Sequence, residues 1–178
     1  MLIQKYNPNW IFDFEKIKQK LETVLPKNTK VEHIGSTAVP NLAAKDIIDI
    51  DIVYFDEADT TFQKVKEDLV KRGYYHNGNQ GIEDREVFKR EKENADEILD
   101  KISHHLYVCP SDSEELKRHL LFRNFLRENE KARQEYESIK FDIALRTNQM
   151  KKEYAELKEK EAKDFIEKTI QKAREQTV

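Results

Sequence analysis

The segment from Ile47 to Tyr54 constrains the fold of this chain most, because it is an apolar strand that carries two acids. Its sequence is IIDIDIVY. Side chains alternate between the faces of a strand, so Asp49 and Asp51 point to one face and the isoleucines between them to the other. Two neighbouring carboxylates repel each other, and burial strengthens the repulsion unless a cation or a shared proton relieves it. The pair is therefore the strongest functional signal in the sequence.

The composition bounds the class of protein. A chain of 178 residues suits one domain, or one domain with a helical extension, and needs no disulfide or metal to fold. Charged residues make up 38% but the net charge is only -3, which argues against a general nucleic-acid binder. The single cysteine, Cys109, excludes an intrachain disulfide and fits a reducing compartment. No signal-peptide pattern opens the chain, and no apolar run approaches the ~20 residues that span a bilayer, so we expect a cytoplasmic protein.

Hydrophobic periodicity predicts an α+β fold with a mixed sheet. We expect a core over residues 1–110, with helices over 111–178 packed on it as one structural unit. The charged run 158–163 predicts that the last helix is exposed or broken there, and 91–101 is expected to be a mobile connection. The predicted elements are a helix from Asn7-Pro8 to Val24, strands over 31–36, 47–54, 74–77, 85–90 and 102–109, a helix over 58–72, and helices starting at Ser111 and covering 131–147 and 150–176.

A Gly-Ser pair precedes the acidic strand. Glycine at position 35 lets the backbone approach a phosphate, and the hydroxyl of Ser36, with Thr37 beside it, can bind that phosphate. Asp49 and Asp51 can hold Mg²⁺, a hard cation that proteins bind with one or two carboxylates together with substrate phosphates. Such a metal would stabilise the charge on a transferring nucleotidyl group.

This arrangement resembles the signature of the DNA polymerase β-like nucleotidyltransferases, and a longer match resembles the GrpB family. That family also occurs as the C-terminal domain of some dephospho-coenzyme A kinases. The resemblance implies a polymerase β-like fold, in which a mixed β-sheet with flanking helices is followed by a C-terminal helical region. It covers nearly the whole chain and fades after about Lys151. The matching segments are HIGSTAVP at 33–40, LAAK at 42–45, IDID at 48–51, Gly81 with Arg85, HHL at 104–106, residues 122–127, and Tyr136 with Lys140.

Two positions depart from the family pattern. Tyr107 stands where the family commonly has the second histidine of a His-Leu-His pattern, and Asn124 where it commonly has the acid of a Phe-Arg-Asp pattern. The roles of the family's residues at these positions therefore do not carry over to this chain.

Several basic residues are candidates for ligand contacts. Arg123 and Arg127 are four apart on one predicted helix and share a face, and an arginine fork suits phosphate. Their alternative role is ion pairing with Glu128 or Glu130. Further candidates for the same cleft are Lys45, Arg85 and Lys140.

Two histidines are also candidates. His33 would face the acidic pair if its strand lies beside the acidic strand; alternatively it is a hydrogen-bonded structural histidine. His105 is favoured over His104 because it shares a strand face with Tyr107. We interpret His76 and His119 as surface or half-buried residues.

A third carboxylate would decide the chemistry. Polymerase β-like enzymes usually add one from another strand, but the strand over 102–109 contains no acid. Glu86, in the strand over 85–90, is the remaining candidate. Without a third acid we expect one metal ion, or none, rather than two.

These patterns predict a nucleotidyltransferase-like protein. It would bind a nucleotide or another phosphorylated small molecule with Mg²⁺ at Asp49 and Asp51, and no nucleic acid or membrane. One alternative is a non-catalytic ligand-binding module. Another is an interaction protein in which the charged helices after Lys131 form a partner or dimer interface and the cleft is vestigial. The acceptor and the oligomeric state stay open.

Overall fold

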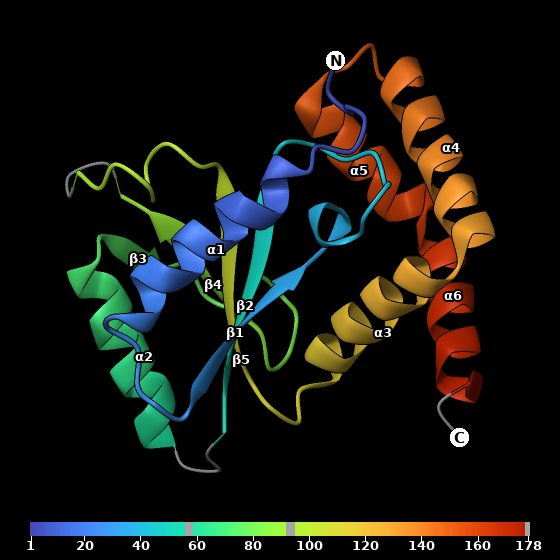
Figure 1. Cartoon of the computed structure of the whole chain (residues 1–178). Helices are drawn as coiled ribbons and strands as arrows, with labels where there is room; N and C mark the ends of the chain where they lie inside the picture. The colour runs from blue at the N-terminus through green and yellow to red at the C-terminus, as the bar shows by residue number, and fades with distance from the viewer. Residues whose placement is uncertain (56–58, 92–94, 177–178) are drawn as a thin grey trace.

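The computed structural model describes residues 1–55, 59–91 and 95–176, and a mixed sheet forms its centre (Figure 1). The strand order is β1-β2-β5-β4-β3. β2 is antiparallel to β1 and parallel to β5, and β4 is antiparallel to both β5 and β3. The strands are β1 (Thr29–Ile34), β2 (Ile48–Tyr54), β3 (Tyr74–His76), β4 (Glu86–Arg90) and β5 (His104–Pro110).

Two helices cover one face of this sheet. α1 (Asn9–Glu22) and α2 (Asp59–Lys71) pack their apolar residues against the isoleucines of β2 and the apolar residues of β5. Trp10 and Ile17 of α1 and Val65 of α2 are fully buried in this core. The polar face of β2, which carries the acidic pair, therefore points away from α1 and α2.

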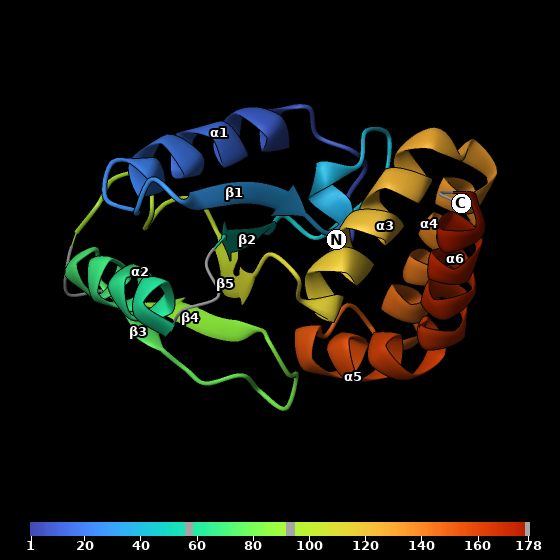
Figure 2. The same cartoon turned by 90° about the horizontal axis from the view of Figure 1, so that it is seen from below.

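The C-terminal helices lie together beside the sheet, at the right in Figure 2, whereas α2 lies at the left. They pack against the segment that joins β1 to β2, where Val39 and Leu42 meet Leu126 and Tyr136. That segment contains the short 3-10 helix η1 (Ser36–Ala38). The helices are α3 (Glu114–Glu128), α4 (Glu130–Arg146), α5 (Lys151–Glu161) and α6 (Lys163–Gln176).

The mixed sheet with flanking helices confirms the predicted fold class, with differences at element ends. α3 begins after Ser113, whose hydroxyl accepts from the backbone N–H of Leu116, rather than at Ser111. The predicted last helix is broken at Ala162 into α5 and α6. No helix in the described part of the chain is long and apolar enough to cross a lipid bilayer.

Two predictions overlap residues outside the described ranges. The predicted second helix starts at residue 58, which lies outside the described ranges; α2 is described from Asp59. Residues 92–94 of the predicted mobile connection are also outside. The part of that connection after them is not simply solvated, because Asp96 accepts hydrogen bonds from the N–H groups of Ile98 and Leu99, and Leu99 is buried in the core.

Candidate functional site

The acidic pair lies on β2, an interior strand of the sheet, on the face that α1 and α2 leave free. In register, Asp49 is opposite His105 of β5 and Asp51 is opposite Tyr107. Asp51 is 1% exposed, whereas Asp49 is half-buried. The predicted alternation along β2 is confirmed, because Ile48, Ile50 and Ile52 are buried in the core formed with α1 and α2.

Gly35 lies directly against Asp49. Its φ is +71°, a left-handed conformation that favours glycine. A Cβ at this position would overlap the carboxylate oxygen Oδ2 of Asp49. The loop that carries Ser36 therefore reaches the acidic strand only because residue 35 has no side chain.

A histidine binds each carboxylate. His105 Nδ1 lies 2.8 Å from Asp49 Oδ1, and His119 Nδ1 lies 2.8 Å from Asp51 Oδ2. A carboxylate only accepts hydrogen bonds, so both histidines carry a proton on Nδ1. Asp51 Oδ1 is buried and has no hydrogen-bond partner within the described ranges. One oxygen of Asp51 is thus left without a donor.

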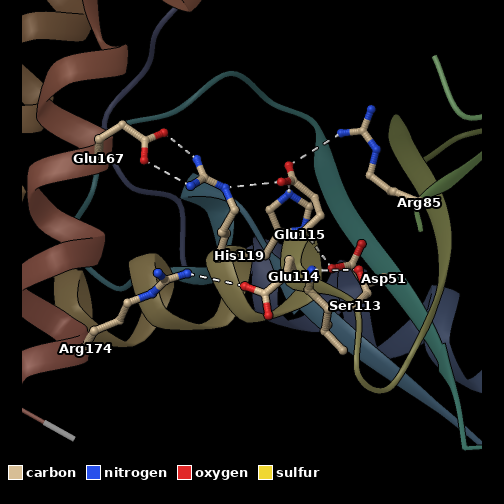
Figure 3. Close-up of polar contacts among 10 residues, drawn as sticks. Asp51, Arg85, Ser113, Glu114, Glu115, His119, Glu167 and Arg174 are labelled. Atoms are coloured by element: carbon tan, nitrogen blue, oxygen red, sulfur yellow. Dashed lines mark hydrogen bonds and ion pairs between the residues drawn. The ribbon is translucent and has the colours of Figure 1, made fainter. Parts of the chain in front are cut away.

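His119 joins Asp51 to a second acid on its own helix. Its Nε2 lies 3.3 Å from Glu115, one helical turn earlier (Figure 3). Burial alone would lower the pKa of His119, but hydrogen bonds to Asp51 and Glu115 and their charges raise it to about 9. The imidazole is therefore charged at neutral pH and relieves the repulsion that the acidic strand would otherwise suffer. The interpretation of His119 as a plain surface or half-buried residue missed this; the i, i+4 spacing from Glu115 was the available signal.

The chain of charges continues to the last helix. Glu115 lies 3.3 Å from Arg118, and the guanidinium of Arg118 donates to both oxygens of Glu167 on α6 at 2.6 and 3.0 Å (Figure 3). Arg85, just before β4, lies 3.9 Å from Glu115. Residues from β2, α3 and α6 are thereby joined in one network.

No third carboxylate joins the pair. Glu86 is in register with Val108, so it points to the opposite face of the sheet, where it pairs with His76 at 2.5 Å. Within residues 1–55, 59–91 and 95–176, no group of three or more His, Cys, Asp or Glu side chains is placed to hold a metal ion. The second acid near Asp51, Glu115, is separated from it by the ring of His119.

Lysines gather around the Gly-Ser pair, and the charge of Asp49 acts on two of them, Lys45 and Lys158. Lys140 of α4 is 2% exposed, and its Nζ donates to Ser36 Oγ at 3.2 Å and to the carbonyl of Ala43. Burial, with the charge of Lys158 of α5, lowers the pKa of Lys140 to about 7. Burial and the same Lys158 also lower the pKa of Lys45, whose Nζ lies 4.2 Å from the centre of the Tyr154 ring.

His33 and Thr37 do not face the acidic pair. His33 is in register with Ile50, hence on the core face, where its ring stacks on Phe14 at 4.5 Å. Its Nε2 lies 3.0 Å from Thr37 Oγ1, which also donates to the carbonyl of Ile47. Burial lowers the pKa of His33 to about 4. The expectation that His33 faces the pair is corrected by this register, and the structural alternative describes the geometry.

Arg123 and Arg127 brace the backbone around the Gly-Ser pair. Arg123 Nη1 donates to Glu32 and to the carbonyl of His33, both at 2.8 Å. Arg127 donates twice to the carbonyl of Ala38, at 2.8 and 3.0 Å. Neither uses the expected partners Glu128 and Glu130 for these bonds. Their direct role in phosphate binding stays a prediction.

Comparison with known proteins places this arrangement in context. A family model described as "GrpB protein" matches residues 1–172. The chain is 32% identical over 145 residues to the Glutamate-rich protein GrpB of Alkalihalophilus pseudofirmus, covering 81% of each chain. It is 35% identical over 141 residues to UPF0157 protein YqkA of Bacillus subtilis, but covers only 38% of that protein's length.

Solved structures show the same fold. The crystal structure of the conserved protein GrpB from Enterococcus faecalis aligns with a TM-score of 0.79 and 30% identity over 98% of both chains. Cid1, a protein with RNA terminal uridylyl transferase activity, aligns with a TM-score of 0.56 and 14% identity over 82% of this chain and 42% of its own. The polymerase β-like fold that the sequence pattern implied is confirmed.

Proposed function

This chain belongs to the GrpB protein family, and we propose that its cleft binds the phosphates of a nucleotide together with one Mg²⁺ ion. The observation that carries the proposal is the convergence of Lys140 on Ser36, next to Asp49. The buried ammonium of Lys140 has no carboxylate bonded to it among the described residues. The charge of Glu137 acts on Lys140 without a bond between them. A buried cation with no bonded anion is costly, and a ligand phosphate would provide that anion.

The surroundings of Lys140 favour a phosphate over a neutral ligand. Lys158 adds positive charge to the same region, because it lowers the pKa of both Lys140 and Lys45. Gly35 exposes backbone at the loop, and the Ser36 hydroxyl is positioned by Lys140. Charged donors, a hydroxyl and exposed backbone are the groups that commonly bind phosphate oxygens.

The acidic pair fits one Mg²⁺ better than two. Asp51 Oδ1 is buried without a donor, and the Oδ2 of Asp49 faces the loop at Gly35. Two carboxylates completed by phosphate oxygens and water suit Mg²⁺, which is rarely held by protein groups alone. A second ion would need a further carboxylate, and His119 already occupies the other oxygen of Asp51.

The reaction that suits this cleft is nucleotidyl transfer. When bound, Mg²⁺ would stabilise the negative charge on the transferring group. The protein's own residues would fix the geometry: Lys140 and Ser36 hold the phosphates, Asp49 is oriented by His105, and Asp51 is oriented by His119. Cid1, which shares the fold, has been determined with MgGTP bound and is described as a poly(U) polymerase, which supports this class of ligand.

A non-catalytic binding module is the second candidate function. The lack of a third carboxylate in the described part of the chain favours it, because transfer enzymes of this fold usually have one. In that case the lysines and Ser36 bind a phosphorylated molecule without a metal. Binding that is equally tight in EDTA and in Mg²⁺ would favour this candidate.

Calorimetric titration with ATP and with GTP tests the proposal. We expect binding to the wild-type protein and a loss of about tenfold or more in affinity for Lys140→Met, since a charged hydrogen bond is removed. Lys152→Met, on the exposed start of α5, serves as the matched control and should bind like wild type. Equal affinities for wild type and Lys140→Met would overturn the phosphate site.

A further inference from the structure

A cavity of about 290 Å³ lies along β4 and β5, next to the acidic pair. Its walls include Arg85, Val87, His105 and Tyr107, with Asn77 and Gln80 from the loop before β4. His105 belongs to both places, because its Nδ1 binds Asp49. A molecule in this cavity would therefore lie beside the site proposed for the nucleotide and Mg²⁺.

Arg85 is the most unusual group in this cavity. Its side chain is 14% exposed, yet its guanidinium makes no hydrogen bond within the described ranges, and its Nε is buried without a partner. The guanidinium lies 4.7 Å from the centre of the Tyr107 ring, which fixes its position. The five N–H donors of an arginine are costly to desolvate without acceptors.

The nearest acid satisfies Arg85 poorly. Glu115 is 3.9 Å away, and its carboxylate is shared with His119 and Arg118, both at 3.3 Å (Figure 3). In the described part of the chain, the residues lining the cavity include no Asp or Glu, whereas Arg85 and Lys89 both line it. The cavity thus offers positive charge and open donors to a ligand.

We propose that this cavity is the subsite for a second substrate, a small molecule with a carboxylate or phosphate that Arg85 binds. The inference rests on the proposed function, because a second substrate implies that the first binds at Ser36 and Lys140. The cavity volume is at the lower limit for drug-sized ligands, so the molecule is small. The family commonly has a histidine at the position of Tyr107. In this chain the Tyr107 ring would orient the guanidinium of Arg85, and thereby determine which second substrate binds.

The hydroxyl of Tyr107 adds a donor rather than a charge. Burial, with the charge of Asp49, raises the pKa of Tyr107, so the phenol stays protonated. The His105 Nε2 has no partner within residues 1–55, 59–91 and 95–176, and the ring is 54% exposed. Both groups can hydrogen-bond to the part of the second substrate that lies toward Asp49.

Titration with glycerol 3-phosphate, glycerate and glycerol tests this subsite on the full chain. We expect binding of at least one of the two anionic probes and none of glycerol; the stronger anion identifies phosphate or carboxylate as the preferred group. Arg85→Gln should weaken probe binding by about tenfold or more, because charged hydrogen bonds are lost. Arg174→Gln, an exposed arginine on α6, is the matched control. Thermal melts of each variant verify folding.

The same titrations separate this inference from the nucleotide proposal. Lys140→Met should leave probe affinity within about twofold of wild type, because its ammonium lies at Ser36 instead. Probe binding lost in Lys140→Met but kept in Arg85→Gln would place the probe among the lysines and overturn the subsite. Failure of both anions to bind wild type would also overturn it. Probe binding through Arg85 without any ATP or GTP binding would support an anion site here and contradict the proposed function.

Discussion

His119 of α3 donates from Nδ1 to Asp51 Oδ2 of the central strand at 2.8 Å, across 68 positions in the chain. This bond gives a carboxylate that is 1% exposed a cation supplied by the protein itself. The imidazolium of His119 thus compensates the charge of Asp51 within the fold itself.

Replacing His119 with Gln should destabilise the protein. The variant leaves Asp51 buried without its cation, which costs about 3 kcal/mol in the free energy of unfolding when one partner of a buried pair is removed. Mg²⁺ should raise the melting temperature of His119→Gln more than that of wild type, because the ion then supplies the missing charge. Thermal melts in Mg²⁺ and in EDTA measure both effects. His76→Gln, at a half-buried pair with Glu86, is the control. An unchanged melting temperature for His119→Gln would contradict this role.

Gly35→Ala should damage the site more than an ordinary glycine substitution. The new Cβ overlaps Asp49 Oδ2, and φ is +71°. Gly81→Ala separates the two effects, because Gly81 has a φ of +79° but nothing within 4 Å of the added Cβ. Backbone strain alone costs about 1 kcal/mol, so Gly81→Ala should lose about that much stability. Gly35→Ala should lose about 2 kcal/mol or more, and should also lose nucleotide binding. Equal losses of unfolding free energy in Gly35→Ala and Gly81→Ala, measured by urea unfolding, would contradict this prediction. They would show that the overlap of the new Cβ with Asp49 does not destabilise the protein.

Stability should fall in acid partly because of His33. Burial lowers the pKa of this histidine to about 4 in the folded protein, from 6.5. Between these values the unfolded chain binds the extra proton, so the free energy of unfolding decreases as the pH falls, by up to about 3 kcal/mol. Urea unfolding from about pH 7 to about pH 4.5 should show this slope, and His33→Asn should reduce it. The same slope in both proteins would rule His33 out as its source.

Lys140→Met should stabilise the protein while it weakens phosphate binding. The pKa of Lys140 is lowered to about 7, whereas the unfolded lysine titrates near 10.5. Between these values the unfolded chain holds more protons, so stability rises with pH, and the penalty for the buried charge is greatest below about pH 7. Removing the charge should add about 1 kcal/mol at about pH 6, since apolar replacement of a buried ion is often stabilising. Chemical unfolding at acidic and alkaline pH measures this; a less stable variant at pH 6 would mean that the bonds to Ser36 and Ala43 outweigh the penalty.

The sequence predicted local patterns well and long-range partners poorly. The alternation of Asp49 with the isoleucines correctly predicted that the acids and the isoleucines lie on opposite faces of the strand, because strand periodicity is a local property. The pairing of Asp51 with His119 depends on how α3 lies over the sheet, which no local pattern reports. The sequence left open whether His33 faces the acidic pair or is structural, because its register with Ile50 depends on the loop between the strands.

The division of the last predicted helix shows the same limit. The charged run 158–163 indicated an exposed or broken segment, but not that Ala162 at the break is buried in one cluster with Leu126 of α3 and Tyr136 of α4. Arg85 was a candidate for ligand contacts from the sequence, but its position over the Tyr107 ring depends on the pairing of β4 with β5.

The most direct test of the account is the Mg²⁺ dependence of nucleotide binding in wild type and Asp49→Asn. Titrations with ATP and GTP in Mg²⁺ and in EDTA, with the exposed substitution Asp112→Asn as control, isolate the metal contribution of Asp49. We predict tighter binding with Mg²⁺ for wild type and Asp112→Asn, by about tenfold, and no such difference for Asp49→Asn. Wild-type binding that is the same with and without Mg²⁺, or an Asp49→Asn variant that keeps the full Mg²⁺ effect, would contradict the account.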